Sequence, residues 1–176
     1  MTIKHPRFWG PGRAYTRVTL PAMDVQAVIT DVDGCLTDGR VYYPAEGVPM
    51  RAFNVKDGVG HEMLVSAGIK VAWLTSGKRA DSTLQRAETI GVEFVDAGSG
   101  DKGPRFLALC ERMGVEPETV VYLGDDVLDL PAMEHAGLTV CPADAADAVA
   151  EAADAVLGIA GGDACLRALA ELIVGA

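Results

Sequence analysis

Residues 25–39 read VQAVITDVDGCLTDG and carry the strongest structural signal in the chain. The run that precedes Asp31 is rich in β-branched side chains, which predicts a short buried strand. Two aspartates, Asp31 and Asp33, and a glycine, Gly34, follow this strand directly. In α/β proteins, ligands bind beyond the carboxyl ends of the strands. The stretch therefore predicts both the first strand of a sheet and a ligand site at its end.

Strands and helices alternate along the rest of the chain. Further strands are expected at residues 69–74, 93–95, 120–123, 138–141 and 155–157, and helices at 57–67, 80–90, 102–113, 128–136, 145–152 and 163–174. Asp101 is expected to cap the helix that starts at Lys102, and Gly114 to end it. This alternation indicates parallel βαβ units in an α/β fold with a doubly wound, mostly parallel, Rossmann-like sheet.

Two segments interrupt this pattern. Residues 40–53 contain two short β-prone runs around an Ala-Glu-Gly turn, which predicts a β-hairpin inserted after the first strand and no separate cap domain. Residues 1–23 contain three prolines and two glycines without periodicity, which predicts an irregular N-terminal arm. We expect residues 24–176 to form one domain.

Composition narrows the class of protein. The chain has 176 residues, of which 49% are hydrophobic and 23% charged, as in an ordinary globular domain. A net charge of −10 argues against nucleic acid as a partner. Widely spaced cysteines favour reduced thiols, and no apolar leader or run of membrane-spanning length is present in the sequence. These features predict a cytoplasmic protein with no membrane partner.

Polar residues follow four of the expected strands: Asp31–Gly34, Thr75–Gly77, Asp101–Lys102 and Gly124–Asp126. Carboxylates that meet at one sheet edge repel each other unless a cation lies between them, and oxygen ligands suit Mg²⁺. Thr75 offers a hydroxyl and Lys102 a positive charge, which fit a phosphoryl group. One aspartate can then act as nucleophile and a second as acid and base. Turn formation or helix capping would explain one such aspartate but not the set.

The amino-acid sequences of these segments resemble the four motifs of the haloacid dehalogenase superfamily of phosphatases. The matching segments are DVDGCLTDG (31–39), LTSGK (74–78), Lys102 and GDDVLD (124–129). FNVKDGVG (53–60) and IAGG (159–162) resemble, more narrowly, the 3-deoxy-D-manno-octulosonate 8-phosphate phosphatase family. The match extends from about residue 25 to the C-terminus.

The resemblance implies a role for each motif residue. Asp31 would be the nucleophile and Asp33 the general acid and base, while Thr75 and Lys102 would bind the phosphoryl group. Asp31, the Asp33 carbonyl and Asp125 would hold Mg²⁺. Asp126 and Asp129 would orient the metal ligands without binding the metal themselves, or cap the next helix.

The family's substrate-contacting positions correspond here to Asn54, Val55, Lys56, Asp57, Gly58, Arg86 and Lys102, with Lys78 in the second motif. The second motif reads TSGKRA, so its basic role could belong to Gly77, Lys78 or Arg79. In that family, tetramers cover the open site and hairpins assemble together, so the resemblance implies a homotetramer.

Two departures affect the expected substrate. Glu62 and Asp163 stand where the family commonly has arginines. The sequence therefore predicts a Mg²⁺-dependent phosphatase for 3-deoxy-D-manno-octulosonate 8-phosphate or a related eight- or nine-carbon sugar-acid phosphate. A phosphatase for another pathway-specific sugar or nucleoside phosphate is an alternative. A phospho-receiver module or a non-catalytic oligomeric partner fits less well, because the aspartate pair follows the first strand and the whole residue set is present.

Overall fold

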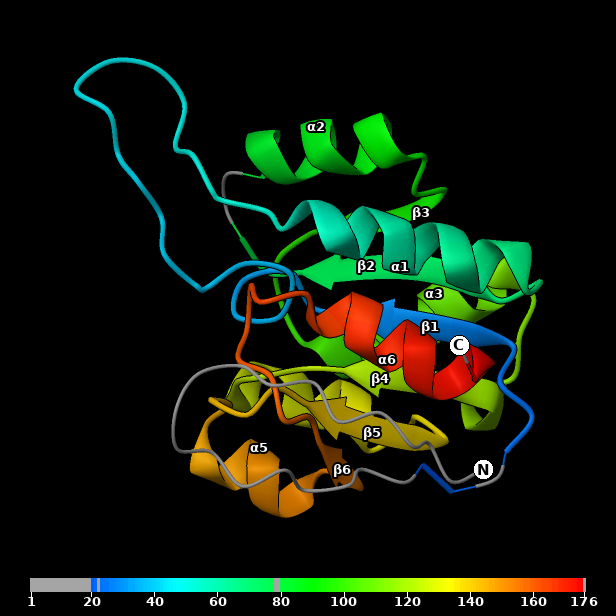
Figure 1. The fold of residues 1–176 in the computed structure, drawn as a ribbon. Coiled ribbons are helices and arrows are strands. Elements are labelled where there is room, and N and C mark those ends of the chain that lie inside the picture. Colours follow the sequence, from blue (N-terminus) through cyan, green and yellow to red (C-terminus); the bar gives the residue numbers. More distant parts are fainter. Residues whose placement is uncertain (1–19, 22, 78–79, 176) are drawn as a thin grey trace.

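The structure, a computed structural model, describes residues 20–21, 23–77 and 80–175. Within them, one parallel sheet has the strand order β3-β2-β1-β4-β5-β6 (Figure 1). The strands are β1 (Ala27–Thr30), β2 (Lys70–Thr75), β3 (Phe94–Ala97), β4 (Val120–Leu123), β5 (Leu138–Cys141) and β6 (Ala155–Val156). This is the expected doubly wound α/β fold. The order reverses between β1 and β4, so their carboxyl ends form the crevice in which such folds bind ligands.

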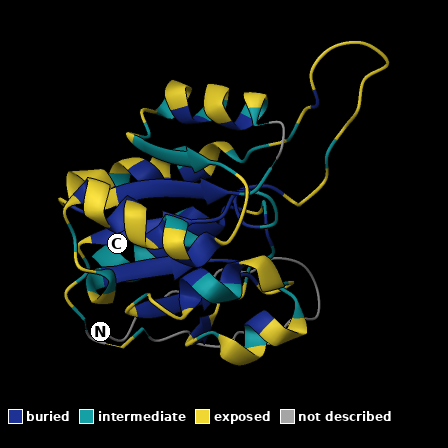
Figure 2. Ribbon diagram, turned by 180° about the vertical axis from the view of Figure 1, so that it is seen from behind, coloured by how far each residue is buried: buried dark blue, intermediate teal, exposed yellow. Residues whose placement is uncertain are grey.

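Helices cover both faces of the sheet. One face carries α1 (Val55–Ser66), α2 (Asp81–Ile90) and α6 (Cys165–Val174), and the other carries α3 (Lys102–Met113), α4 (Leu130–Met133) and α5 (Asp147–Ala152). Successive strand residues point to opposite faces: Val28 packs with the first group of helices, and Ile29 with the second. Figure 2 shows the resulting central layer of buried strands.

Most of the expected elements are present, with shifts at their ends. The strands at 120–123 and 138–141 and the helix at 102–113 have the expected bounds. The helix expected at 128–136 is wrong. A 3-10 helix, η2 (Val127–Asp129), leads into the short α4 there, and Pro131 lies in the first turn of α4. Asp126 and Asp129 form a capping box that fixes this tight turn. A second 3-10 helix, η1 (Pro117–Thr119), precedes β4.

The insertion after β1 is an exposed loop closed by one antiparallel bridge, between Tyr42 and Met50. The two strands of a full hairpin are absent from described residues 40–53, where Pro44 and Pro49 each lack the amide hydrogen that a ladder needs. The loop projects from the body of the molecule on the side where the strands end (Figures 1 and 2). It is the whole insertion, so no separate cap domain follows β1.

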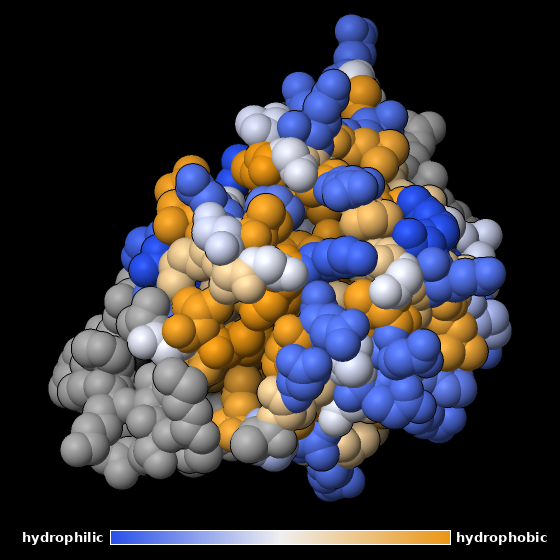
Figure 3. All heavy atoms as spheres, turned by 90° about the vertical axis from the view of Figure 1, so that its right-hand side faces the viewer, coloured by the Kyte–Doolittle hydropathy of each residue, from blue (hydrophilic) through white to orange (hydrophobic). Residues whose placement is uncertain are grey.

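The opposite edge of the molecule, where the strands begin, faces the viewer in Figure 3. Leu20 and Met23, which precede β1, pack against the apolar cluster between the sheet and α6. Residues 1–19 and 22 of the expected N-terminal arm lie outside the described residues. Among the described residues, no helix is both long enough and apolar enough to cross a membrane.

Candidate active site

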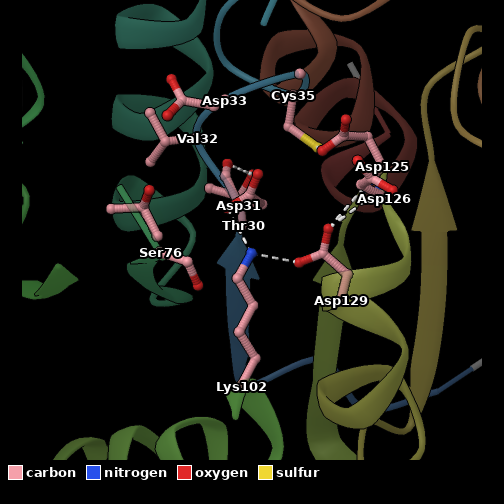
Figure 4. A network of polar contacts seen from close by, with 12 residues as sticks. Thr30, Asp31, Val32, Asp33, Cys35, Ser76, Lys102, Asp125, Asp126 and Asp129 are labelled. Carbon is pink, nitrogen blue, oxygen red and sulfur yellow. Dashed lines mark hydrogen bonds and ion pairs between the residues drawn. The ribbon is translucent and has the colours of Figure 1, made fainter. Parts of the chain in front are cut away.

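Lys102 joins two carboxylates at the centre of the crevice. Its Nζ donates to Asp31 Oδ1 and to Asp129 Oδ1, each at 2.6 Å, and all three side chains are buried (Figure 4). Asp31 follows β1, while Lys102 begins α3, where Asp101 caps the helix by accepting from the Gly103 amide. Burial would lower the pKa of Lys102, but Asp31 and Asp129 raise it, so the ammonium is charged. The helix dipole disfavours a positive charge at the start of a helix, and the ion pairs with Asp31 and Asp129 offset this cost for Lys102.

Asp129 organises the loop after β4. Its Oδ1 also accepts from the Tyr122 hydroxyl at 2.6 Å. Its Oδ2 accepts from the amides of Asp125 at 3.0 Å and Asp126 at 3.2 Å (Figure 4). The Asp126 carboxylate instead accepts from the Val127 amide as a cap, so Asp126 reaches this network through its backbone. Asp129 therefore fixes the backbone from which Asp125 extends toward Asp31.

Asp31 and Asp125 converge on a space that fits a divalent cation. Ligand atoms of Asp31, Cys35 and Asp125 lie within 4.8 Å of one another. Gly34 makes the approach possible: it has a φ of +99°, and a Cβ there would lie 2.0 Å from Asp125 Oδ2. Burial, and then the negative charges of Asp31 and Asp129, raise the pKa of Asp125 to about 8. A cation would remove this repulsion, and carboxylate oxygens suit Mg²⁺.

Cys35 is the sulfur group in this cluster, and its thiol donates to Asp125 Oδ1 at 3.8 Å. Burial, together with the neighbouring carboxylates, raises the pKa of the Cys35 thiol well above its usual value. It therefore remains a neutral thiol, and the hard oxygen atoms are the groups suited to Mg²⁺.

We expect Mg²⁺ binding to weaken as pH falls from 8.5 to 6. The pKa of Asp125 is raised to about 8 and that of Asp31, by burial first, to about 6, so protons compete with the cation. The metal-free protein should show the opposite trend. Because these aspartates bind protons more tightly when folded, its stability decreases as pH rises from about 4 to about 8.

Calorimetry in buffers of different ionisation enthalpy, with Mg²⁺ as titrant, measures this coupling. Proton release near pH 7.5 that is diminished in Asp125→Asn agrees with the geometry. Binding without proton release at that pH would show that Mg²⁺ binds elsewhere.

Thr75 ends β2 beside this centre, and Arg105 holds the turn that follows it. Arg105 donates from one terminal nitrogen to the Thr75 carbonyl at 2.7 Å and from the other to Ser76 Oγ at 3.3 Å. Asp96, on β3, orients the guanidinium through a 2.7 Å ion pair. The Thr75 hydroxyl accepts from the Gly77 amide at 3.3 Å. The sequence pattern did not reveal Arg105, because its partners come from two other strands.

Asp33 lies at the mouth of the crevice and pairs with Arg51. Arg51 Nε and Nη2 donate to the two carboxylate oxygens of Asp33 at 2.5 and 3.0 Å. In Figure 4 the Asp33 carboxylate points away from the group formed by Asp31, Lys102 and Asp129. Arg51 was missed in the sequence, although it lies just before the FNVKDGVG segment.

The predicted substrate segment, residues 54–58, begins α1. Asn54 caps this helix by accepting from the Lys56 amide at 3.0 Å, and its amide group donates to the Gly162 carbonyl at 3.2 Å. Asp57 is buried and accepts from the Arg167 amide at 3.1 Å, so its carboxylate caps α6 rather than facing the crevice. Burial raises the pKa of Asp57 to about 6.

The Gly-Gly pair of IAGG lies against the loop after β1. A Cβ at Gly161 would lie 1.9 Å from the Gly34 carbonyl oxygen, and one at Gly162 would lie 2.6 Å from the Asp38 amide. These glycines let the segment before α6 support the loop that carries Asp31 and Asp33.

Arg86 lies beside the start of α1. A Cβ at Gly58 would lie 3.1 Å from an Arg86 terminal nitrogen, and both residues line a groove of about 550 Å³ between α1 and α2. Glu62 also lines this groove, whereas Asp163 is exposed at the start of the α6 region and is not among the lining residues.

Val55 lines the groove, and Lys56 is exposed. Lys78 and Arg79 lie outside the described residues.

Comparisons with known proteins agree with these motifs. A family model described as haloacid dehalogenase-like hydrolase matches residues 65–169. The 3-deoxy-D-manno-octulosonate 8-phosphate phosphatase of Salmonella typhi is 37% identical over 163 residues, which cover 93% of this chain and 86% of that protein.

Two solved structures have the same fold. The cobalt-bound deoxy-D-mannose-octulosonate 8-phosphate phosphatase of Haemophilus influenzae has a TM-score of 0.83 and 36% identity, covering 86% of this chain and 88% of that chain. The Moraxella catarrhalis 3-deoxy-D-manno-octulosonate 8-phosphate phosphatase, in complex with magnesium ion, phosphate ion and KDO molecule, has a TM-score of 0.81 and 31% identity. That match covers 86% of this chain and 87% of that chain.

Proposed function

Since the chain belongs to the haloacid dehalogenase-like hydrolases and, among them, to the 3-deoxy-D-manno-octulosonate 8-phosphate phosphatases, we propose that it hydrolyses this sugar-acid phosphate with Asp31 as the nucleophile. Membership makes the chain a magnesium-dependent phosphoric monoester hydrolase. The observation that carries the residue assignment is the buried contact between Lys102 and Asp31 at the end of β1, beside Asp125.

In the proposed reaction, an Asp31 carboxylate oxygen attacks phosphorus while the bond from phosphorus to the sugar oxygen breaks. Asp33 gives its proton to that oxygen, so the sugar leaves as an alcohol. Asp33 then takes a proton from a water molecule that attacks the aspartyl phosphate. The bond from phosphorus to Asp31 breaks, and phosphate leaves.

The other residues prepare these steps. A pKa of about 6 for Asp31, raised by burial and lowered by Lys102, leaves its carboxylate ionised at neutral pH. Thr75, Gly77 and Lys102 would contact the oxygens of the phosphoryl group. Asp31, the Asp33 carbonyl and Asp125 would hold Mg²⁺, which would supply positive charge against the carboxylates and the phosphoryl group.

A substrate screen tests the proposal. Values of kcat/KM are measured with Mg²⁺ for 3-deoxy-D-manno-octulosonate 8-phosphate, nine-carbon sugar-acid phosphates, neutral sugar phosphates and nucleotides. The proposal expects the octulosonate phosphate to have the highest value. A higher value for a neutral sugar phosphate or a nucleotide would overturn the substrate assignment while keeping the phosphatase chemistry.

Glu62→Gln should lower KM for the octulosonate phosphate about threefold, because Glu62 puts a negative charge in the groove beside Arg86. The KM for p-nitrophenyl phosphate, which has no carboxylate, should not change. Glu88→Gln, an exposed substitution on α2, is the matched control. An unchanged or raised KM for the octulosonate phosphate in Glu62→Gln would show that the groove does not repel its carboxylate.

We also propose a cytoplasmic homotetramer. The insertion exposes Tyr42, Tyr43, Val48 and Met50, an apolar group that a neighbouring subunit would cover. Light scattering tests this: a mass of four chains supports the proposal, and a single-chain mass contradicts it.

A further inference from the structure

Arg51, a residue of the insertion, contacts the proposed acid, Asp33. The insertion is largely exposed, yet the Arg51 side chain is only 6% exposed and both oxygens of Asp33 accept hydrogen bonds from it. Such bidentate pairing fixes the orientation of a carboxylate more tightly than a single contact. The Asp33 hydrogen bond raises the pKa of Arg51, so the guanidinium keeps its charge.

Three side chains meet at Gly77, in the turn that follows Thr75. A Cβ at Gly77 would lie 3.1 Å from Arg51 Nη2, 3.6 Å from Asp33 Oδ2 and 3.6 Å from the Thr75 hydroxyl oxygen. Gly77 therefore leaves space where the proposed acid, the phosphoryl-binding hydroxyl and the guanidinium face one another. Arg51 pairs with Asp33 at the edge of this space, so it contacts the group that the proposed function assigns as the acid.

We propose that Arg51 is a positioning residue that orients the Asp33 carboxylate for proton transfer to the leaving group. The inference rests on the proposed function, since it assumes that Asp33 is the acid. The transfer itself moves the Asp33 proton to the leaving oxygen as its bond to phosphorus breaks. Arg51 exchanges no proton in this step and fixes the position of the carboxylate. The insertion thereby takes part in catalysis through one residue, without forming a lid.

Leaving-group dependence separates this role from a merely structural one. An alkyl alkoxide needs a proton as it leaves, whereas p-nitrophenolate leaves readily without one. Arg51→Met should therefore lower the single-turnover rate at which the octulosonate phosphate phosphorylates Asp31 by about 30-fold, within the range of acid catalysis, and the same rate for p-nitrophenyl phosphate less than about threefold. This rate is compared in place of kcat, because Asp33 also assists the later hydrolysis of the aspartyl phosphate, a step that both substrates share. Arg51→Lys, which keeps the charge but not the bidentate geometry, should fall between wild type and Arg51→Met on the alkyl substrate.

Arg40→Met is the matched control, because Arg40 lies on the same insertion and pairs at the surface with Asp38. It should leave both rates unchanged. In an Asp33→Asn background, Arg51→Met should have little further effect on the alkyl substrate, because Arg51 acts through Asp33. A cooperative thermal unfolding transition shows that each variant is folded, because turnover cannot report this for Asp33→Asn, in which hydrolysis of the intermediate is slow.

Equal losses on the two substrates, or additive effects of the Asp33 and Arg51 substitutions, would overturn the inference. Failure of the proposed function would look different. Wild type would then not hydrolyse the octulosonate phosphate, and the Arg51 comparison would use whichever alkyl phosphate the screen identifies as a substrate.

Discussion

Asp31→Asn is expected to lower phosphate release by at least about 10⁴-fold, the scale of loss when a nucleophile is removed. The amide has the shape of the carboxylate but cannot form the aspartyl phosphate. The fold should persist, because burial raises the pKa of Asp31 and the charged carboxylate is therefore costly to bury. Steady-state rates with Mg²⁺ and thermal unfolding without it measure the two effects.

Asp24→Asn is the control for this variant, because Asp24 is exposed and precedes the other end of β1. It should retain wild-type rates. Turnover by Asp31→Asn within tenfold of wild type would exclude Asp31 as the nucleophile, whereas a lost thermal transition would indicate a role in folding instead.

Lys102→Met should have the second large effect, on both activity and stability. Nζ of Lys102 is the shared donor to Asp31 and Asp129, and its removal leaves two buried carboxylates near Asp125 without that cation. Breaking a buried ion pair on one side costs about 3 kcal/mol or more. We expect a loss of about 10³-fold or more in kcat/KM, because a positive charge on the phosphoryl group is also lost.

Arg112→Met, on the exposed face of α3, controls for the loss of a positive charge from this helix. Saturating Mg²⁺ should restore part of the stability of Lys102→Met but not its activity, since a cation offsets the carboxylates without replacing the ammonium. Full activity at high Mg²⁺ would show that Lys102 only neutralises its neighbours.

The sequence predicts well which residues lie at the edge of the sheet where the strands end. Asp31, Lys102 and Asp125 follow apolar runs or begin helices, and a parallel sheet brings such positions together regardless of their separation along the chain. The bounds of α3 follow from local signals at both ends: Asp101 caps its start, and Gly114 ends it in the left-handed region. Local pattern and fold geometry agree here, so the predicted bounds of α3 are confirmed.

Elsewhere, contacts between distant segments decide the structure. The helix expected at 128–136 is broken because Asp129 turns back to bind the Asp125 and Asp126 amides, a tertiary requirement that helical periodicity does not contain. Arg51 and Arg105 contact Asp33 and the Thr75 carbonyl across long stretches of chain. Asp57 lies within a predicted substrate segment, yet its carboxylate caps α6, which only the packing of α1 on α6 reveals.

Trapping the aspartyl phosphate identifies the nucleophile of the proposed reaction. Asp33→Asn, which should slow hydrolysis of the intermediate, is mixed with a phosphorylated substrate and Mg²⁺, quenched in acid and reduced with borohydride. Reduction converts an aspartyl phosphate to homoserine, which peptide mass spectrometry locates. We expect homoserine at position 31, and none in Asp33→Asn that also carries Asp31→Asn. Homoserine at another aspartate, or phosphate release in the quench with no modified peptide, would contradict it.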